Sequence, residues 1–207
     1  MGVGSFEKLE NYVAERITEF NNIGKERIQA LSGLAASVRE EIKRQDHADL
    51  IFICTHNSRR SHLGHLWAQM ATNFYQLEGV NCYSGGTEAT AFNPAAVQAL
   101  ERAGMIISRE DHSVNPVYLV KFPGSEKGIQ VFSKKYTDPP NPGSNFIAVM
   151  TCSEADENCP IVYGAIKRHS LTYKDPKEYD GTPREGSGYD ERCRQIAREM
   201  FFLFSRV

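Results

Sequence analysis

Four consecutive apolar residues, Leu50 to Ile53, are followed by a short polar segment and then by an amphipathic helical pattern. A continuous apolar run of this kind is typical of a strand that is buried on both faces in a parallel sheet. Apolar side chains then recur at helical spacing between about Ser61 and Tyr75. Parallel strands need long crossover connections, usually helices. This strand–loop–helix unit therefore predicts an α/β fold.

Strand and helix patterns continue to alternate along the rest of the chain. Further strands are predicted at residues 80–83, 146–151 and 166–171. A helix opened by Asn93-Pro94 runs to about Ala103, and a closing helix covers residues 190–204. We therefore predict a central, mainly parallel four-stranded sheet that is flanked by helices.

Two segments depart from this alternation. Residues 5 to 46 carry two amphipathic helical patterns, which predict a helical hairpin. We place this N-terminal helical extension at residues 1–47 and the main α/β domain at residues 48–207. The hairpin either covers the main domain or forms a homodimer contact. An insertion at about residues 114–145 contains two strand-like runs around a turn-rich segment and predicts a β-hairpin.

Composition limits the classes of function. The formal net charge of -2 gives no basis for binding nucleic acid or an anionic membrane. No apolar run is long enough to span a bilayer, and no N-terminal segment resembles a secretory signal, so we expect a cytoplasmic protein. The 5 cysteines are sparse and odd in number, and none form a CxxC pair. This pattern argues against a secreted disulfide framework and against structural zinc.

The polar loop after the first strand places Arg60 behind Cys54 at the spacing Cys-x5-Arg. A strand-to-helix loop can point its backbone N–H groups inward, and the helix N-terminus adds positive charge, so the loop can bind a tetrahedral oxyanion such as phosphate or arsenate. The Arg60 guanidinium can bind two oxygens of that anion. The same field favours the nucleophilic thiolate form of Cys54. The predicted oxyanion-binding residues are Thr55, His56, Asn57, Ser58, Arg59, Arg60 and Ser61.

The alternative is a buried cysteine at a strand end that is followed by a polar turn. Cys-x5-Arg is a short pattern, but its position between an apolar strand and an amphipathic helix makes it specific. With this context the chain resembles the low-molecular-weight protein tyrosine phosphatase superfamily, which includes the thioredoxin-linked arsenate reductases. The resemblance covers about residues 49–206. It is carried by LIFICTHNSRRS, by Tyr83–Glu88 followed by Asn93-Pro94, and by Val149–Pro160.

The resemblance implies roles for individual residues of the loop. Cys54 matches the family's nucleophile, and Arg60 matches its anion-binding arginine. Ser61 matches a serine that assists the thiolate, and Asn57 matches an asparagine that holds the loop in shape.

Three positions depart from the family pattern. His56 stands where the family usually has glycine, so His56 must accept the backbone angle that glycine would take. Arg59 stands where a second cysteine is frequent. His65 stands where the arsenate reductases carry an acidic side chain near a cation, so we expect no metal site.

A carboxylic acid near the loop would protonate the oxygen that leaves during transfer of the oxyanion. Two Asp-Pro pairs provide candidates, Asp138-Pro139 and Asp175-Pro176. Asp175 follows the last predicted strand, where the family's acid loop falls, whereas Asp138 lies in the insertion, where Asp-Pro commonly starts a turn. We therefore favour Asp175 as the general acid. Without the resemblance, Asp175 could equally be a turn or cap residue.

Cys152 and Cys159 decide between two activities. Both lie in the segment that resembles the redox segment of the arsenate reductases. In that case Cys152 could attack a Cys54 adduct and Cys159 could resolve it by disulfide exchange, which would turn arsenate into arsenite. If both thiols are inert, the enzyme is instead a low-molecular-weight protein tyrosine phosphatase that hydrolyses phosphotyrosine or aryl phosphates.

The preferred prediction is a thiol-dependent arsenate reductase. No bound cofactor is expected, and an external thiol reductant such as thioredoxin would reduce the Cys152–Cys159 disulfide. The segment between these cysteines would have to unwind for the disulfide to form, because bridged Cα atoms lie within about 7 Å. A redox-sensing or oxyanion-binding adaptor is the remaining alternative.

Overall fold

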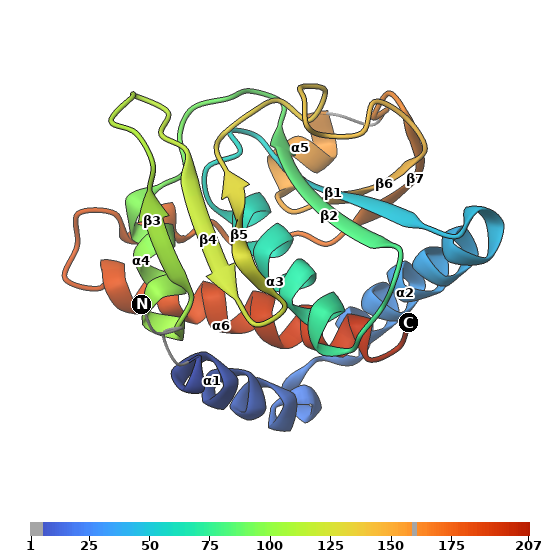
Figure 1. Ribbon diagram of the computed structural model, residues 1–207, viewed down its shortest axis with the longest axis horizontal. Coiled ribbons are helices and arrows are strands. Elements are labelled where there is room, and N and C mark those ends of the chain that lie inside the picture. Colours follow the sequence, from blue (N-terminus) through green and yellow to red (C-terminus); the bar gives the residue numbers. More distant parts are fainter. Residues whose placement is uncertain (1–5, 159–160) are drawn as a thin grey trace.

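A four-stranded sheet with strand order β2-β1-β6-β7 forms the centre of the molecule (Figure 1). The computed structural model describes residues 6–158 and 161–207. The strands of this sheet are β1 (Ala48–Cys54), β2 (Val80–Gly86), β6 (Phe146–Met150) and β7 (Ala165–Ser170). Every pairing among them is parallel. The predicted α/β architecture is therefore confirmed, with each strand close to its predicted position.

β1 is a central strand because its side chains are apolar on both faces. Alternate residues of β1 enter a large core on one face of the sheet and a small core on the other. At its end, Cys54 pairs with Gly86 of β2, and Ile53 pairs with Met150 of β6. The carboxyl ends of three strands therefore meet at one edge of the sheet, where parallel sheets usually carry their functional sites.

Helices cover both faces of this sheet (Figure 1). The large core lies under α3 (Arg60–Phe74), α4 (Pro94–Ala103) and α6 (Glu185–Phe204). The small core lies under the short helix α5 (Ser153–Asn158), which contributes Ala155. A 3-10 helix, η2 (Pro176–Tyr179), connects β7 to α6. Helix α6 begins five residues before its predicted start, because residues 185–189 are mostly polar and give no apolar periodicity.

The N-terminal extension folds as α1 (Glu7–Thr18), a 3-10 turn η1 (Phe20–Asn22) and α2 (Lys25–Gln45). The apolar faces of both helices are buried in the chain's own large core, through residues such as Leu9 and Leu31. Tyr12 of α1 stacks on Trp67 of α3, with the ring centroids 5.4 Å apart. The two predicted helices are therefore an integral part of the core, but the predicted hairpin is wrong, because α1 packs mainly on α6 and α2 packs mainly on α6 and β1, and not on each other. None of the described helices is long and apolar enough to cross a bilayer.

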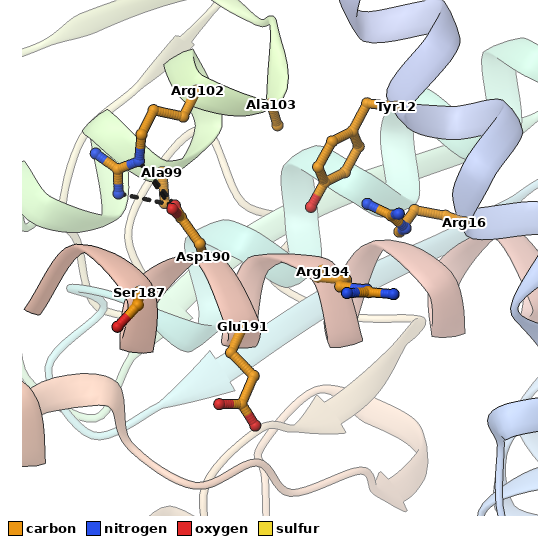
Figure 2. Close-up of a pocket in the computed structure, with 9 residues that line it drawn as sticks. All are labelled: Tyr12, Arg16, Ala99, Arg102, Ala103, Ser187, Asp190, Glu191 and Arg194. Atoms are coloured by element: carbon orange, nitrogen blue, oxygen red, sulfur yellow. Dashed lines mark hydrogen bonds and ion pairs between the residues drawn. The ribbon is translucent and has the colours of Figure 1, made fainter. Parts of the chain in front are cut away.

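Helices α1, α4 and α6 enclose a pocket of about 370 Å³ on the side of the molecule that carries the extension (Figure 2). Tyr12 and Arg16 enter it from α1, and Arg102 of α4 forms an ion pair with Asp190 of α6 at 2.8 Å (Figure 2). Its lining contains no residue of the loop between Cys54 and Ser61. The pocket is therefore separate from the site predicted from the sequence.

The insertion, together with the segment that precedes it, forms a second, antiparallel sheet with strand order β3-β4-β5. Its strands are β3 (Ile106–Arg109), β4 (Tyr118–Phe122) and β5 (Ser125–Val131). The predicted hairpin is β4–β5, whereas β3 was not predicted, because it is short and largely exposed. Buried side chains of β4 attach this sheet to the large core. After β5 the chain returns to the end of β2, where Lys135 bridges to Gly86.

Candidate active site

Cys54 lies at the carboxyl end of β1 and is almost completely buried. Its Sγ lies 3.1 Å from Ser61 Oγ, at the start of α3. Asn57 Nδ2 donates to the same Ser61 oxygen at 2.9 Å. Because Asn57 supplies that hydrogen, the hydroxyl hydrogen of Ser61 remains free to donate to the sulfur. The three side chains therefore form a chain of hydrogen bonds that ends at the Cys54 sulfur.

The backbone of this loop has its left-handed residue at Asn57, with φ 44, and not at His56. The expectation that His56 takes an angle suited to glycine is therefore wrong. Asparagine tolerates positive φ better than most residues because its short polar side chain bonds locally. Here Asn57 Oδ1 also accepts from the backbone N–H of Lys134 at 2.9 Å. The asparagine thus fixes the turn from inside the loop.

The loop also carries unsatisfied donors. Within the described chain, no hydrogen-bond acceptor contacts the backbone N–H groups of residues 56–59. The Nε–H of Arg60 is likewise buried and has no partner among the described residues. Unpaired buried donors are costly, so such a group favours a bound anion. The start of α3 adds the partial positive charge of a helix N-terminus.

Glycine at position 86 allows β2 to approach the loop closely. A Cβ at Gly86 would lie 2.7 Å from the backbone nitrogen of Asn57 and 2.2 Å from the Glu88 oxygen. Such distances are too short for any side chain. The motif Tyr83–Glu88 therefore contributes its backbone to the site: Thr87 N–H and Glu88 N–H donate to the carbonyls of Cys54 and Thr55.

The insertion braces the outer side of the loop. Ser133 Oγ donates to the carbonyl of His56 at 3.0 Å, and Thr90 Oγ1 donates to the same carbonyl at 3.1 Å. The Lys134 carbonyl accepts from Gly86 N–H at 2.9 Å. The sequence singled out Lys134 only as a residue of the insertion that could border a larger substrate, and it did not predict that Ser133 or the Lys134 backbone contacts the loop. Their contribution depends on where the returning chain crosses the end of β2.

A buried basic cluster belongs to the same region, made up of His62, His65 and Lys134. Burial, reinforced by the nearby Lys134 charge, lowers the pKa of His65 to about 3 and holds that of His62 well below its usual range. Burial lowers the pKa of Lys134 to about 8, although Asp138 opposes this shift. Both histidines are therefore neutral at pH 7, and Lys134 carries the positive charge of the cluster.

Asp175 approaches the loop from the segment between β7 and α6. Its Oδ2 accepts from Arg60 Nη2 at 2.5 Å, and its Oδ1 accepts from Lys177 N–H at 3.0 Å, which caps η2. The other Asp-Pro aspartate, Asp138, instead accepts from Lys135 N–H at 3.0 Å within a turn. The predicted nucleophile, arginine and acid therefore converge at one edge of the sheet.

Arg59 was grouped with the oxyanion-binding residues, but its side chain is engaged elsewhere. Arg59 Nε donates to the Tyr189 hydroxyl at 2.7 Å, and Nη2 donates to Asp180 Oδ2 at 2.9 Å. Its Nε lies 4.0 Å from Asp175 Oδ1. The Nε and Nη2 groups of Arg59 are thus engaged away from the loop. Asp180 and Tyr189 carried no sequence signal that linked them to this site.

Cys152 lies completely buried beside the loop, at the end of β6. Its Sγ is 3.5 Å from Thr55 Oγ1, and it accepts from Ala155 N–H at 3.3 Å. The Thr55 hydroxyl donates to Glu154 Oε2 at 3.1 Å. Cys54 and Cys152 pack in the same small core. Cys159 lies outside the described residues.

Cys82 and Cys193 lie away from the loop and are buried. Burial raises the pKa of Cys193 to about 12, and it also raises the pKa of the Cys82 thiol. Cys193 Sγ accepts from the Trp67 indole N–H at 3.3 Å. Both thiols therefore stay protonated and belong to the core.

Sequence comparison relates this chain to known proteins. No protein-family profile matches the chain. An arsenate reductase of Bacillus licheniformis is 27% identical over 158 residues, which cover 76% of this chain and 95% of that protein. Arsenate reductase 2 of Staphylococcus haemolyticus is 30% identical over 131 residues, which cover 63% of this chain and 80% of that protein.

Solved structures share the fold at low sequence identity. A low-molecular-weight protein tyrosine phosphatase from T. tengcongensis matches with a TM-score of 0.52 and 14% identity, over 77% of this chain and 99% of that one. An arsenate reductase in its phosphate-binding state matches with a TM-score of 0.51 and 13% identity, over 77% of this chain and 98% of that one. These two matches show that this chain shares the fold of both solved structures.

Proposed function

Since the chain belongs to the arsenate reductases of the low-molecular-weight phosphatase superfamily, we propose that it reduces arsenate to arsenite with Cys54 as nucleophile. The observation that carries this proposal is the second thiol, because Cys152 contacts Thr55, the residue next to Cys54. Hydrolysis of a phosphate ester needs no second thiol, whereas reduction needs two electrons from a pair of thiols.

Anion binding is the first step. Arsenate accepts hydrogen bonds from the unpaired N–H groups of residues 56–59 and from the Nε–H of Arg60. Both kinds of donor are preorganised, so the protein does not have to rearrange them at the moment of reaction. Inorganic phosphate has the same shape and charge and should bind as a competitor.

Nucleophilic attack follows. The Cys54 thiolate, stabilised by the Ser61 hydroxyl at 3.1 Å, attacks arsenic and forms a sulfur–arsenic bond. One arsenate oxygen leaves as water after it takes up protons. Asp175 is the proposed proton donor because it contacts Arg60, which holds the anion.

Reduction then passes through the second thiol. The Cys152 thiolate attacks the Cys54 sulfur, a Cys54–Cys152 disulfide forms, and the electron pair of the sulfur–arsenic bond leaves with arsenic as arsenite. Cys159 next attacks Cys152, which frees Cys54 and leaves a Cys152–Cys159 disulfide. An external dithiol, for which we propose thioredoxin, returns this disulfide to two thiols.

The second candidate is a protein tyrosine phosphatase that uses Cys54, Arg60 and Asp175 alone. The convergence of these three groups would suffice for hydrolysis of an aryl phosphate. The aromatic side chain near the acid is not placed to stack on an aryl group, however. Tyr179, the aromatic residue of η2, packs against Gly188, where an added Cβ would lie 2.1 Å from the ring. It is therefore turned toward α6.

The two activities are separated by supplying arsenate with a thioredoxin system and, in parallel, an aryl phosphate. We expect arsenate-dependent consumption of reductant in the wild type, and a loss of at least about 100-fold in Cys152→Ser and Cys159→Ser. Cys82→Ser, which changes a thiol of β2 that is buried away from the loop, is the matched control and should retain activity. Hydrolysis of the aryl phosphate that is indifferent to both serine variants, without arsenate-dependent oxidation, would establish the phosphatase instead.

A further inference from the structure

Two neighbouring arginines hold the two ends of the segment that carries the proposed acid. Arg60 Nη2 donates to Asp175 at 2.5 Å, and Arg59 Nη2 donates to Asp180 at 2.9 Å. These aspartates flank η2 on either side. Because the arginines are consecutive in the chain, residues 175–180 are attached at both ends to the start of α3.

One of these attachments conflicts with anion binding. Arg60 is the proposed ligand of the oxyanion, yet its guanidinium is paired with Asp175 in the structure. Arsenate and phosphate carry one to two negative charges near neutral pH and accept the same donors, so an anion in the loop competes with the Asp175 carboxylate for Arg60. Binding therefore weakens one attachment of the acid segment at the moment when the acid is needed.

The other attachment faces no such competition. Arg59 Nε donates to the Tyr189 hydroxyl at 2.7 Å, and that hydroxyl donates to Asp180 Oδ1 at 2.6 Å, which closes a network of three side chains. Tyr189 is fully buried in α6, and the Arg59 side chain is 14% exposed. Burial and the hydrogen bond to Asp180 raise the pKa of Tyr189 above its usual range, so the hydroxyl keeps its hydrogen.

We propose that Arg59 is a positioning residue that holds residues 175–180 against the loop while the substrate anion displaces Asp175 from Arg60. The proposal rests on the anion site described under the proposed function. Arg59 then affects turnover through Asp175, and its side chain is not a ligand of the anion. The same role would serve reduction and hydrolysis alike.

Amide hydrogen exchange tests this role without any measurement of activity. The N–H groups of Glu178, Asp180 and Thr182 donate to carbonyls of the segment, so their exchange rates report its opening. Saturating inorganic phosphate should change these rates by less than about twofold in the wild type. In Arg59→Met, phosphate should accelerate them by about tenfold, the change that corresponds to loss of one charge-assisted hydrogen bond.

Arg102→Met is the matched control, because Arg102 also pairs with an aspartate of the chain, Asp190 of α6, but makes no hydrogen bond or ion pair to residues 54–61 or 175–180 within the described chain. This variant should behave as the wild type does. Arg59→Lys keeps the positive charge but loses the planar group that donates to both Tyr189 and Asp180. Phosphate should accelerate amide exchange in this variant by an intermediate amount. The lysine variant also tests the positioning role if Arg59→Met fails to fold.

Steady-state kinetics give a second reading. Arg59→Met should lower kcat about tenfold and leave the Kd for phosphate within about threefold of the wild-type value. Combined with Asp175→Asn, it should add little further loss, because both changes act on one function. Equal losses in kcat and in phosphate affinity, or losses that multiply in the double variant, would overturn the positioning role.

The outcomes separate this inference from the proposed function. A wild-type protein that fails to bind phosphate would reject the anion site and the role of Arg59 together. Phosphate binding without accelerated exchange in Arg59→Met would reject only the positioning role. Phosphate binding with accelerated exchange would support the role even if the enzyme proves to be a phosphatase.

Discussion

The loop from Cys54 to Ser61 is held on its two sides by different kinds of contact. On the side of the insertion, the buried residues Ser133 and Lys134 make hydrogen bonds to His56 and Asn57. On the side of α6, ion pairs join Arg59 and Arg60 to aspartates whose side chains are about one third exposed. The first side is neutral where it touches the loop, and the second is charged.

This difference separates two tasks. Buried neutral hydrogen bonds do not respond to salt, and leaving either partner unsatisfied is costly. Partly exposed ion pairs contribute about 1 kcal/mol or less each and are weakened by salt, and the Arg60–Asp175 pair is also weakened by a competing anion. The insertion side therefore fixes the shape of the loop, whereas the α6 side allows the acid to respond to the substrate.

The largest effect should come from Asn57→Ala on the insertion side. This change leaves the Lys134 N–H without its acceptor, removes a donor to Ser61 Oγ, and places alanine at φ 44. We expect the free energy of unfolding to fall by about 3 kcal/mol and turnover to fall by at least about 100-fold. Denaturant titration and the arsenate assay measure the two effects.

The control for that variant is Asn145→Ala. Asn145 also has a positive φ, 61, but it is exposed and lies outside the loop. Its replacement should cost about 1 kcal/mol for backbone strain and leave turnover intact. If both variants lose the same stability, the hydrogen bonds of Asn57 contribute nothing and the insertion side is not the fixed one.

A smaller effect, which depends on pH, should come from Lys134→Met. Lys134 reaches the loop through its backbone N–H, so methionine keeps that contact and removes only the buried charge. Below pH 8 the ammonium is charged in the folded and unfolded states, and its burial is unfavourable. The variant should therefore be more stable than the wild type by about 2 kcal/mol at pH 7.

This stability gain should shrink as the pH rises. The folded protein releases the Lys134 proton at about pH 8, whereas the unfolded chain holds it until about 10.5. The unfolded state binds more protons in this window, so the wild type gains stability there and the variant does not. Lys135→Met, which changes the exposed neighbour, is the control. A stability difference that stays constant from pH 7 to 10 would contradict the assignment.

The smallest effect should come from Asp175→Asn on the α6 side. Asparagine competes less with an anion for Arg60, so the affinity for inorganic phosphate should rise by about threefold. Calorimetric titration at low and high salt measures the change, which should diminish as salt screens the pair. Asp138→Asn, at the other Asp-Pro pair, should leave phosphate affinity unchanged. Weaker binding by Asp175→Asn would mean that Asp175 helps the anion to bind.

The strand–loop–helix unit could be predicted from the sequence because its signals are local. Leu50 to Ile53 define the strand, and the residue types from Cys54 to Ser61 define the chemistry within a few positions. The family resemblance then pointed to Asp175, which the structure brings to Arg60. The roles of the site residues in catalysis stay predictions, and Cys159 lies outside the described chain.

The contacts that support the site could not be predicted in the same way. Arg59 meets Asp180 and Tyr189, which lie 121 and 130 positions further along the chain. Such contacts depend on how η2 and α6 pack, and no local pattern records them. β3 was not predicted for a related reason. It is a strand because it pairs with β4, whereas its own sequence shows no strand periodicity.

The single tryptophan makes the docking of the N-terminal helix visible in solution. Trp67 is completely buried, with Tyr12 of α1 stacked on its ring and Cys193 accepting its indole hydrogen bond. Release of α1 would uncover that ring to water, so its emission should shift to longer wavelength. Intrinsic fluorescence therefore reports the attachment of the extension without any label, and it does so independently of the chemistry at Cys54.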